Sequence, residues 1–243
     1  MNTAKLKMFA QDARRRLLAQ VAARVEAALR MEGAAAAENT KAIDELKRAI
    51  FETSKAAVIE RAAYTWFNRF CALRFMDANG YSVVRAVSPV EGATQPEILA
   101  EAKQGIVHED LLAPAIRKRV NDLLTGTLRS TDAQGEAYRL LLVGACNYYH
   151  QIMPYLFEKI EDYTELLLPL DLLSEDSVLS ATRRALDEDT CQNVEVIGWL
   201  YQFYISEKKD AVFAAKEKVA AEDIPAATQL FTPNWIVRYL VEN

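Results

Sequence analysis

The sequence predicts an all-α fold, specifically an irregular multi-helix bundle. Of its 243 residues 51% are hydrophobic, which is enough to fill a real core. Only 8 Gly and 7 Pro are present, whereas Ala, Leu, Glu, Lys and Arg dominate, and these are good helix formers. Long segments also carry apolar residues at the three- and four-residue spacing of one helix face. These observations favour helices over the turn-rich sequence of a β-sandwich or barrel.

Two helices are expected in the first quarter of the chain. The first spans residues 5–31, because Leu and Val recur along it at helical spacing and Gly33 is placed to stop it. The alanine run at residues 34–37 is expected to be a connector. Asn39 or Thr40 can then cap a second helix. The Thr-Ser pair at residues 53–54 offers a break or a fresh cap for the segment that follows.

The segment at residues 58–76 has the widest apolar face and ends in Asn79-Gly80, a typical helix stop. It is therefore expected to form the centre of the core. Its aromatic residues could form a base-stacking platform, but stacking on nucleic acid needs exposed rings. Core packing is the preferred interpretation. The aromatic residues concerned are Tyr64, Trp66, Phe67, Phe70 and Phe75.

The pattern changes after residue 80. Residues 81–87 have a β-like composition, and Pro89, Gly92 and Pro96 mark a loop, so the sequence allows one short β-hairpin near residues 81–90. A sub-boundary of the helical domain is placed near residues 80–110. Helical segments then resume, with the third of them expected to be interrupted or bent near Pro154. They are expected at residues 98–103, 111–124, 135–157, 166–170, 176–186 and 194–220.

Charge and cysteine usage limit the function. A net charge of −5 argues against a dedicated nucleic-acid-binding domain, so any DNA contact must be local. Short basic clusters at residues 14–16, 117–119, 183–184 and 208–209 are interpreted as solvated helix faces. The three widely spaced cysteines suit buried reduced thiols, as in the cytoplasm. Neither a signal peptide nor a run of about 20 apolar residues is present, so no membrane association is expected.

Catalytic motifs are missing from the sequence. His108 and His150 lie far apart without further ligands at metal-binding spacing, so no metal site is predicted. Neither a nucleophile elbow nor a glycine-rich phosphate or dinucleotide loop is present. The acidic stretches at residues 161–162, 175–176 and 187–189 are interpreted as exposed caps. No catalytic residue can therefore be named.

The last residues predict a helix that needs a partner. Thr232 is a good N-cap and Pro233 suits the first helical position. Apolar residues from Trp235 to Leu240 would give this helix an apolar face. About ten residues are too few for a stable isolated helix, so this element is expected to dock on another part of the protein.

Two strings resemble a known family. TQLFTPNWIVRYLVEN, residues 228–243, resembles motif X, which opens the methyltransferase region of the gamma-type adenine-specific DNA methyltransferases. AAYTWFNRFCALRFMDANGY, residues 62–81, is similar to a helical signature of large single-chain modification enzymes. Together they resemble most the adenine-specific DNA methyltransferases of BREX phage-defence systems, with type IIG restriction–modification enzymes as close relatives.

The resemblance implies a division at about residue 225. Residues 1–225 would form an N-terminal helical domain, and residues 226–243 would begin the methyltransferase domain. Phe231, Thr232 and Pro233 would line or support the S-adenosylmethionine pocket. The glycine-rich cofactor loop and the Asn-Pro-Pro-Tyr or Phe motif are absent, so the chain would stop before the catalytic core.

In the family, the parent enzyme flips adenine out of double-stranded DNA and methylates its exocyclic nitrogen. The present chain alone is expected to be inactive, and to brace the methyltransferase core while offering phosphate contacts or a surface for other defence-system proteins. The alternative is a stand-alone helical protein-interaction module with no enzymatic activity.

Overall fold

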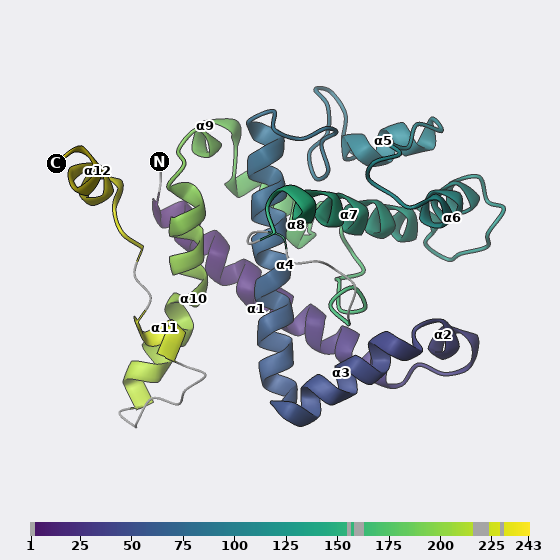
Figure 1. Cartoon of the computed structure of the whole chain (residues 1–243), viewed down its shortest axis with the longest axis horizontal. Coiled ribbons are helices and arrows are strands. Elements are labelled where there is room, and N and C mark those ends of the chain that lie inside the picture. The colour runs from purple at the N-terminus through teal and green to yellow at the C-terminus, as the bar shows by residue number, and fades with distance from the viewer. Residues whose placement is uncertain (1–2, 155–156, 158–162, 216–223, 229–230) are drawn as a thin grey trace.

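The computed structural model describes residues 3–154, 157, 163–215, 224–228 and 231–243. Within these residues the chain forms twelve helices and no β-strand (Figure 1). The prediction of an all-α, irregular bundle is therefore confirmed. No helix of the described part is both long and apolar enough to cross a membrane.

The centre of the molecule is a group of four helices. α1 (Thr3–Leu29) packs against α4 (Lys55–Ala78), α8 (Val178–Ala185) and α10 (Val196–Ala215). Figure 1 shows α1 crossing behind the upright α4. The residues of α1 that face these helices recur every three or four positions, as the sequence pattern predicts. They are Leu6, Phe9, Ala10, Ala13, Leu17, Val21, Val25 and Ala28.

The aromatic residues of α4 lie in the core. Trp66, Phe67 and Phe70 are at most 1% exposed, which confirms core packing and excludes these three rings as a base-stacking surface. The Trp66 indole Nε1 donates to the Thr164 carbonyl at 3.1 Å, so its one polar group is satisfied. Phe67 also packs on Tyr204 of α10, with ring centroids 4.4 Å apart.

A second group is formed by α5 (Glu97–Lys103), α6 (Pro114–Leu124) and α7 (Ala133–Ile152), which pack on one another. α7 ends two residues before Pro154. This confirms the predicted interruption near Pro154, because proline disfavours helical geometry in the residue before it. Residues 155–156 of the predicted helix lie outside the described residues.

The helix starts near residues 40 and 55 differ in chemistry. Ser54 caps α4 by accepting a hydrogen bond from the Ala57 amide at 3.0 Å, as predicted. The alanine run is wrong as a connector, since it forms the short helix α2 (Gly33–Glu38). Neither Asn39 nor Thr40 caps α3 (Thr40–Glu52) with its side chain. Both side chains donate backwards to carbonyls of α2, so they close that helix instead.

Two local predictions are wrong in the middle of the chain. The structure has no β-hairpin at residues 81–90, because the amides of Ala86, Val87 and Ser88 bond to the Asp77 carboxylate and not to a neighbouring strand. Residues 166–170 form turns and not a helical piece.

Three short helices complete the described chain: α9 (Glu188–Cys191), α11 (Ile224–Thr228) and α12 (Asn234–Glu242). α10 ends at Ala215, and the rest of the helix predicted to residue 220 lies outside the described residues. α12 begins one residue later than expected, with Pro233 at the N-cap and no side-chain cap. Figure 1 shows α12 at the edge of the molecule.

Candidate functional site

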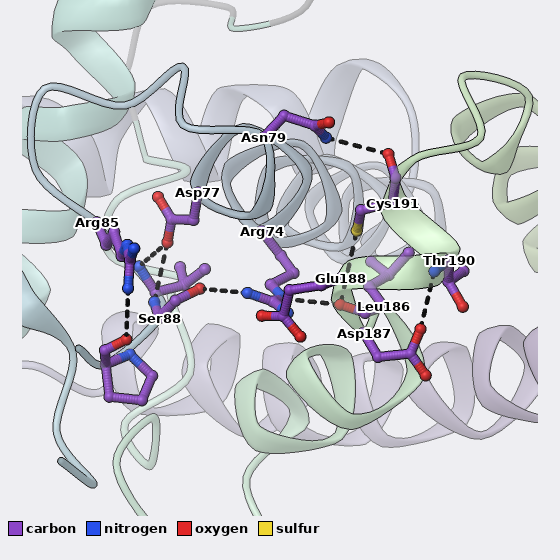
Figure 2. A network of polar contacts seen from close by, with 12 residues as sticks. Arg74, Asp77, Asn79, Arg85, Ser88, Leu186, Asp187, Glu188, Thr190 and Cys191 are labelled. Carbon is purple, nitrogen blue, oxygen red and sulfur yellow. Dashed lines mark hydrogen bonds and ion pairs between the residues drawn. The ribbon is translucent and has the colours of Figure 1, made fainter. Parts of the chain in front are cut away.

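Arg74 is a buried cation at the carboxyl end of α4 and organises a polar network (Figure 2). Its Nε donates to the Leu186 carbonyl at 2.7 Å, and its Nη1 donates to Ser88 Oγ at 2.9 Å. Its Nη2 donates to Glu188 Oε1 at 2.7 Å, which completes an ion pair with a carboxylate that is itself 73% exposed. One guanidinium therefore joins α4 to the residues after α8 and to the 82–88 segment.

Asp77 lies three residues further along α4 and holds the 82–88 segment. Its carboxylate accepts from the amides of Ala86, Val87 and Ser88 at 3.1, 2.9 and 2.9 Å, and from Ser82 Oγ at 2.6 Å. Burial raises the pKa of Asp77, while these hydrogen bonds act in the opposite direction. The carboxylate supplies the acceptors that a β-ladder would otherwise supply.

The same end of α4 is tied to α9. Asn79 Nδ2 donates to the Cys191 carbonyl at 3.0 Å, and Asp187 caps α9 by accepting from the Thr190 amide at 2.9 Å (Figure 2). The hydrogen bonds from Thr190 hold the pKa of Asp187 below its ordinary value, and the Arg74 hydrogen bond does the same for Glu188. Asp187 thus acts as a helix cap, as the sequence predicts for residues 187–189, whereas the ion pair of Glu188 with Arg74 was not predicted.

A hollow of about 1090 Å³ lies beside this network. Its walls come from the end of α4, the loop at residues 85–96, residues 172–175 and α8. Arg74, Arg183 and Arg184 all line it. The structure therefore places the 183–184 pair, interpreted from sequence as a solvated face, at the edge of a concave surface, with Arg183 half-buried.

The predicted cofactor residues lie elsewhere, against α10. The Phe231 ring packs on Trp199, with centroids 5.6 Å apart, and its amide donates to Gln202 Oε1 at 3.3 Å. The ring also lies so close to Gly198 that a Cβ there would overlap it. The Asn234 amide donates to Glu195 Oε1 at 2.7 Å. The two ends of the 231–234 segment are thus held by α10 and by Glu195, the residue directly before it.

Thr232 is exposed and Pro233 is half-buried, so Phe231 is the member of the predicted trio that packs on α10 through its side chain. α12 itself has no buried residue. Trp235 and Leu240 are each 71% exposed, and Val237, Tyr239 and Val241 are also exposed. The apolar face expected on this helix is present, and it is open to solvent.

The two histidines make hydrogen-bonding contacts within the fold, and the three cysteines are buried in it. His108 Nε2 pairs with Glu101 at 2.9 Å, and His150 Nδ1 contacts the Phe157 carbonyl at 2.6 Å. Cys71, Cys146 and Cys191 are buried free thiols, and burial raises the pKa of Cys146 to about 12. Across the described ranges, no group of three His, Cys, Asp or Glu side chains gathers as a metal site.

Sequence reasoning missed Arg74, Asp77 and Gly198. The available signal was local in each case. Arg74 and Asp77 are charged residues within an apolar helix, three positions apart and hence on one face. Gly198 is a glycine inside a helix of large apolar residues, which often marks close approach of another group.

Comparisons with known proteins show which proteins the chain is similar to. No protein-family model matches it. Over 189 residues it is 49% identical to the adenine-specific methyltransferase BrxX of Escherichia coli O9:H4 (strain HS). Over 192 residues it is 42% identical to the adenine-specific methyltransferase PglX of Lacticaseibacillus casei (strain Zhang). Each match covers 76% of this chain, but only 15% and 16% of the respective relative.

The chain is therefore related to adenine-specific methyltransferases. Over about three quarters of its length it is PglX- and BrxX-like, which confirms the relation inferred from the two sequence strings. The matched part spans about a sixth of the length of these relatives.

Proposed function

We propose that residues 1–225 form the helical scaffold of an S-adenosylmethionine-dependent N6-adenine DNA methyltransferase of a BREX-type phage-defence system. Residues 226–243 would begin its methyltransferase domain. The proposal is supported by the similarity to the BrxX and PglX methyltransferases, of which the matched part is a small fraction. The intact enzyme would act in the cytoplasm on duplex DNA, alongside other defence-system proteins.

The exposed surface of α12 is the observation that carries this proposal. A nine-residue helix is too short to be stable by itself in water, and α12 buries none of its side chains. Five of its apolar side chains are exposed on this one short element. An exposed apolar surface of this kind marks a site of contact with another part of a protein. A cofactor-binding domain that follows motif X would bury it.

The anchoring of residues 231–234 suggests a separate role for each predicted residue. The Phe231 ring packs against Trp199 and Gly198, so we assign it to supporting the cofactor pocket from the scaffold side. Thr232 and Pro233 are not held in this way and are the members that would line the pocket. S-adenosylmethionine would supply the methyl group. The residues of this chain would position one wall of its site and take no part in the transfer.

Calorimetric titration tests whether the pocket is incomplete in this chain. We expect no measurable binding of S-adenosylmethionine by the 243-residue chain, and no methylation of duplex DNA. Clear saturable binding would contradict the assignment of residues 231–233 to one wall of a larger site.

A second test joins the chain to the catalytic part of a relative. In that protein, Leu240→Asp is expected to weaken S-adenosylmethionine binding, because it places a charge in the contact between α12 and the added domain. Phe51→Asp is the matched control, since Phe51 is 90% exposed on α3 and belongs to no proposed contact. Equal effects of the two substitutions would refute the proposed docking of α12.

The alternative function, a stand-alone interaction module, is less well supported because the relatives are named as methyltransferases. The reading frame beyond Asn243 separates the two. A glycine-rich strand–turn–helix followed by an Asn-Pro-Pro motif would favour the enzyme, and a stop codon at that point would favour the module.

A further inference from the structure

Two neighbouring arginines of α8 line the 1090 Å³ hollow and contact two different walls of it. Arg183 donates from Nη2 to Ser180 Oγ at 2.9 Å and from Nη1 to the Thr94 carbonyl at 3.5 Å. Arg184 donates from Nη1 to the Glu175 carbonyl at 2.9 Å. Thr94 belongs to the loop wall, and Glu175 belongs to the 172–175 wall. Both guanidinium groups are therefore oriented by neutral oxygen atoms.

Neither arginine has a carboxylate partner among the described residues. Two other arginines that line the hollow do have carboxylate partners. Arg74 pairs with Glu188, and Arg85 lies 3.9 Å from Glu97. A guanidinium has five N–H donors, so Arg183 and Arg184 keep donors beyond those used for neutral oxygens. Their positive charges are left uncompensated by any direct ion pair.

The arginines also affect one another. Burial lowers the pKa of Arg183, and the nearby charges of Arg74 and Arg184 lower it further, although Tyr138 acts in the opposite direction. Like charges that are held together in a partly desolvated hollow would be stabilised by an anion between them.

The acidic residues at the rim leave room for such an anion. Asp77 is occupied by three backbone amides and Ser82, and Glu188 is neutralised by Arg74. Glu91 and Glu175 are exposed to solvent, where their charges are screened. Arg183 is half-buried on the helix wall, while Arg184 and the free carboxylates of Glu91 and Glu175 are exposed.

We propose that this hollow binds a phosphate group through Arg183 and Arg184. Guanidinium groups suit this ligand because their planar donors match phosphate oxygens in bidentate geometry. The phosphate could belong to a nucleic-acid backbone or to a free anion, and the chemistry of recognition is the same for both. The inference does not rest on the proposed methyltransferase function, because it uses neither α12 nor the cofactor segment.

The test measures binding of two probes to the 243-residue chain. A short fluorescein-labelled DNA duplex is followed by anisotropy, and inorganic phosphate is followed by chemical shifts of the arginine Nε–H groups. We use Arg183→Gln, Arg184→Gln and the double variant that carries both, which remove the charge while keeping an amide that can donate to the same oxygens. Circular dichroism is the check that each variant keeps the helical fold.

For DNA we expect the double variant to bind on the order of tenfold more weakly at about 0.1 M salt. The slope of log K against log salt should also fall by about two, because two phosphate contacts are lost. Arg129→Gln is the matched control, since Arg129 is exposed in the 125–132 connector and does not line the hollow. Glu175→Gln should strengthen binding, because it removes a nearby negative charge.

The outcomes separate the sources of the phosphate. Loss of DNA binding in the double variant, with Arg129→Gln unaffected, supports a backbone phosphate. Phosphate-dependent shifts that vanish in the double variant, without DNA binding by the wild type, support a free anion. Binding of neither probe overturns the proposal. DNA binding that is equally sensitive to Arg129→Gln and to the double variant also overturns it.

Discussion

Replacing Asp77 tests whether its carboxylate takes the place of a β-ladder. Asp77→Ala removes the acceptor for the amides of Ala86, Val87 and Ser88, whose residues are 0, 0 and 3% exposed. A buried donor without a partner costs about 1–3 kcal/mol. Burial raises the pKa of Asp77, so desolvation of the carboxylate offsets part of the gain. We therefore take the lower figure per amide, and expect a loss of about 3 kcal/mol in the free energy of unfolding.

Urea unfolding followed by far-ultraviolet circular dichroism measures this loss, which is a large part of the stability of an ordinary domain. Asp77→Asn should cost roughly half as much, because its single amide oxygen can still accept. Asp187→Ala is the control, since Asp187 is a half-exposed helix cap whose loss should cost about 1 kcal/mol. If Asp77→Ala costs no more than this control, the assigned role of Asp77 is wrong.

Three further predictions concern the same elements. Gly198→Ala should leave global stability nearly unchanged, because alanine favours the helix while its Cβ displaces the Phe231 ring. Faster hydrogen exchange at residues 231–240 would reveal the displacement, and unchanged exchange would contradict it. The ion pair with Arg74 lowers the pKa of Glu188, so its contribution is present above the ordinary value of 4.5 and is lost as pH falls through the lowered value. The stability difference between wild type and Glu188→Gln should therefore shrink below about pH 4.5, and a difference that grows on acidification would oppose this sign. Arg74→Lys should cost about 2–4 kcal/mol in urea unfolding, because an ammonium cannot reach the three acceptors of the guanidinium; a cost below about 1 kcal/mol would show that the charge alone suffices.

The helices could be predicted because their signal lies in neighbouring residues. The spacing of Leu17, Val21 and Val25 predicts which face of α1 is buried, and the structure buries all three side chains. Ser54 and Gly80 likewise mark the ends of α4 within a few residues of where they act, with Gly80 at a φ of 69°. Predictions of this kind hold when local chemistry and tertiary packing agree.

The hairpin prediction failed because the decisive acceptor lies outside the segment. Residues 81–87 have strand-like composition, but the Asp77 carboxylate, from the preceding helix, binds the amides that a strand partner would need. No pattern within the segment could reveal this. Composition indicated that these residues avoid helix, and the nearby carboxylate decided what they form.

The candidate site was least predictable because its contacts join distant residues. Arg74 meets Leu186 and Glu188 over more than a hundred positions, and Arg183 meets Thr94 over 89. From sequence, residues 183–184 could only be assigned to a helix surface. Whether that surface is flat or concave depends on the loop that faces it, so the hollow emerges only in three dimensions.

The terminal segment combines a fixed base with an open helix, and this combination bears on how a following domain would be oriented. Phe231 packs on α10 and the Asn234 amide bonds to Glu195, directly before α10, so contacts already made within this chain set the direction in which α12 begins. The exposed side of α12, from Trp235 to Val241, then faces whatever it meets in a defined orientation. A linker that only joined two domains would need neither the packing of Phe231 against Gly198 nor the hydrogen bond from the Asn234 amide to Glu195. If the proposed function holds, the contacts of residues 231–234 would position the following domain as well as connect to it.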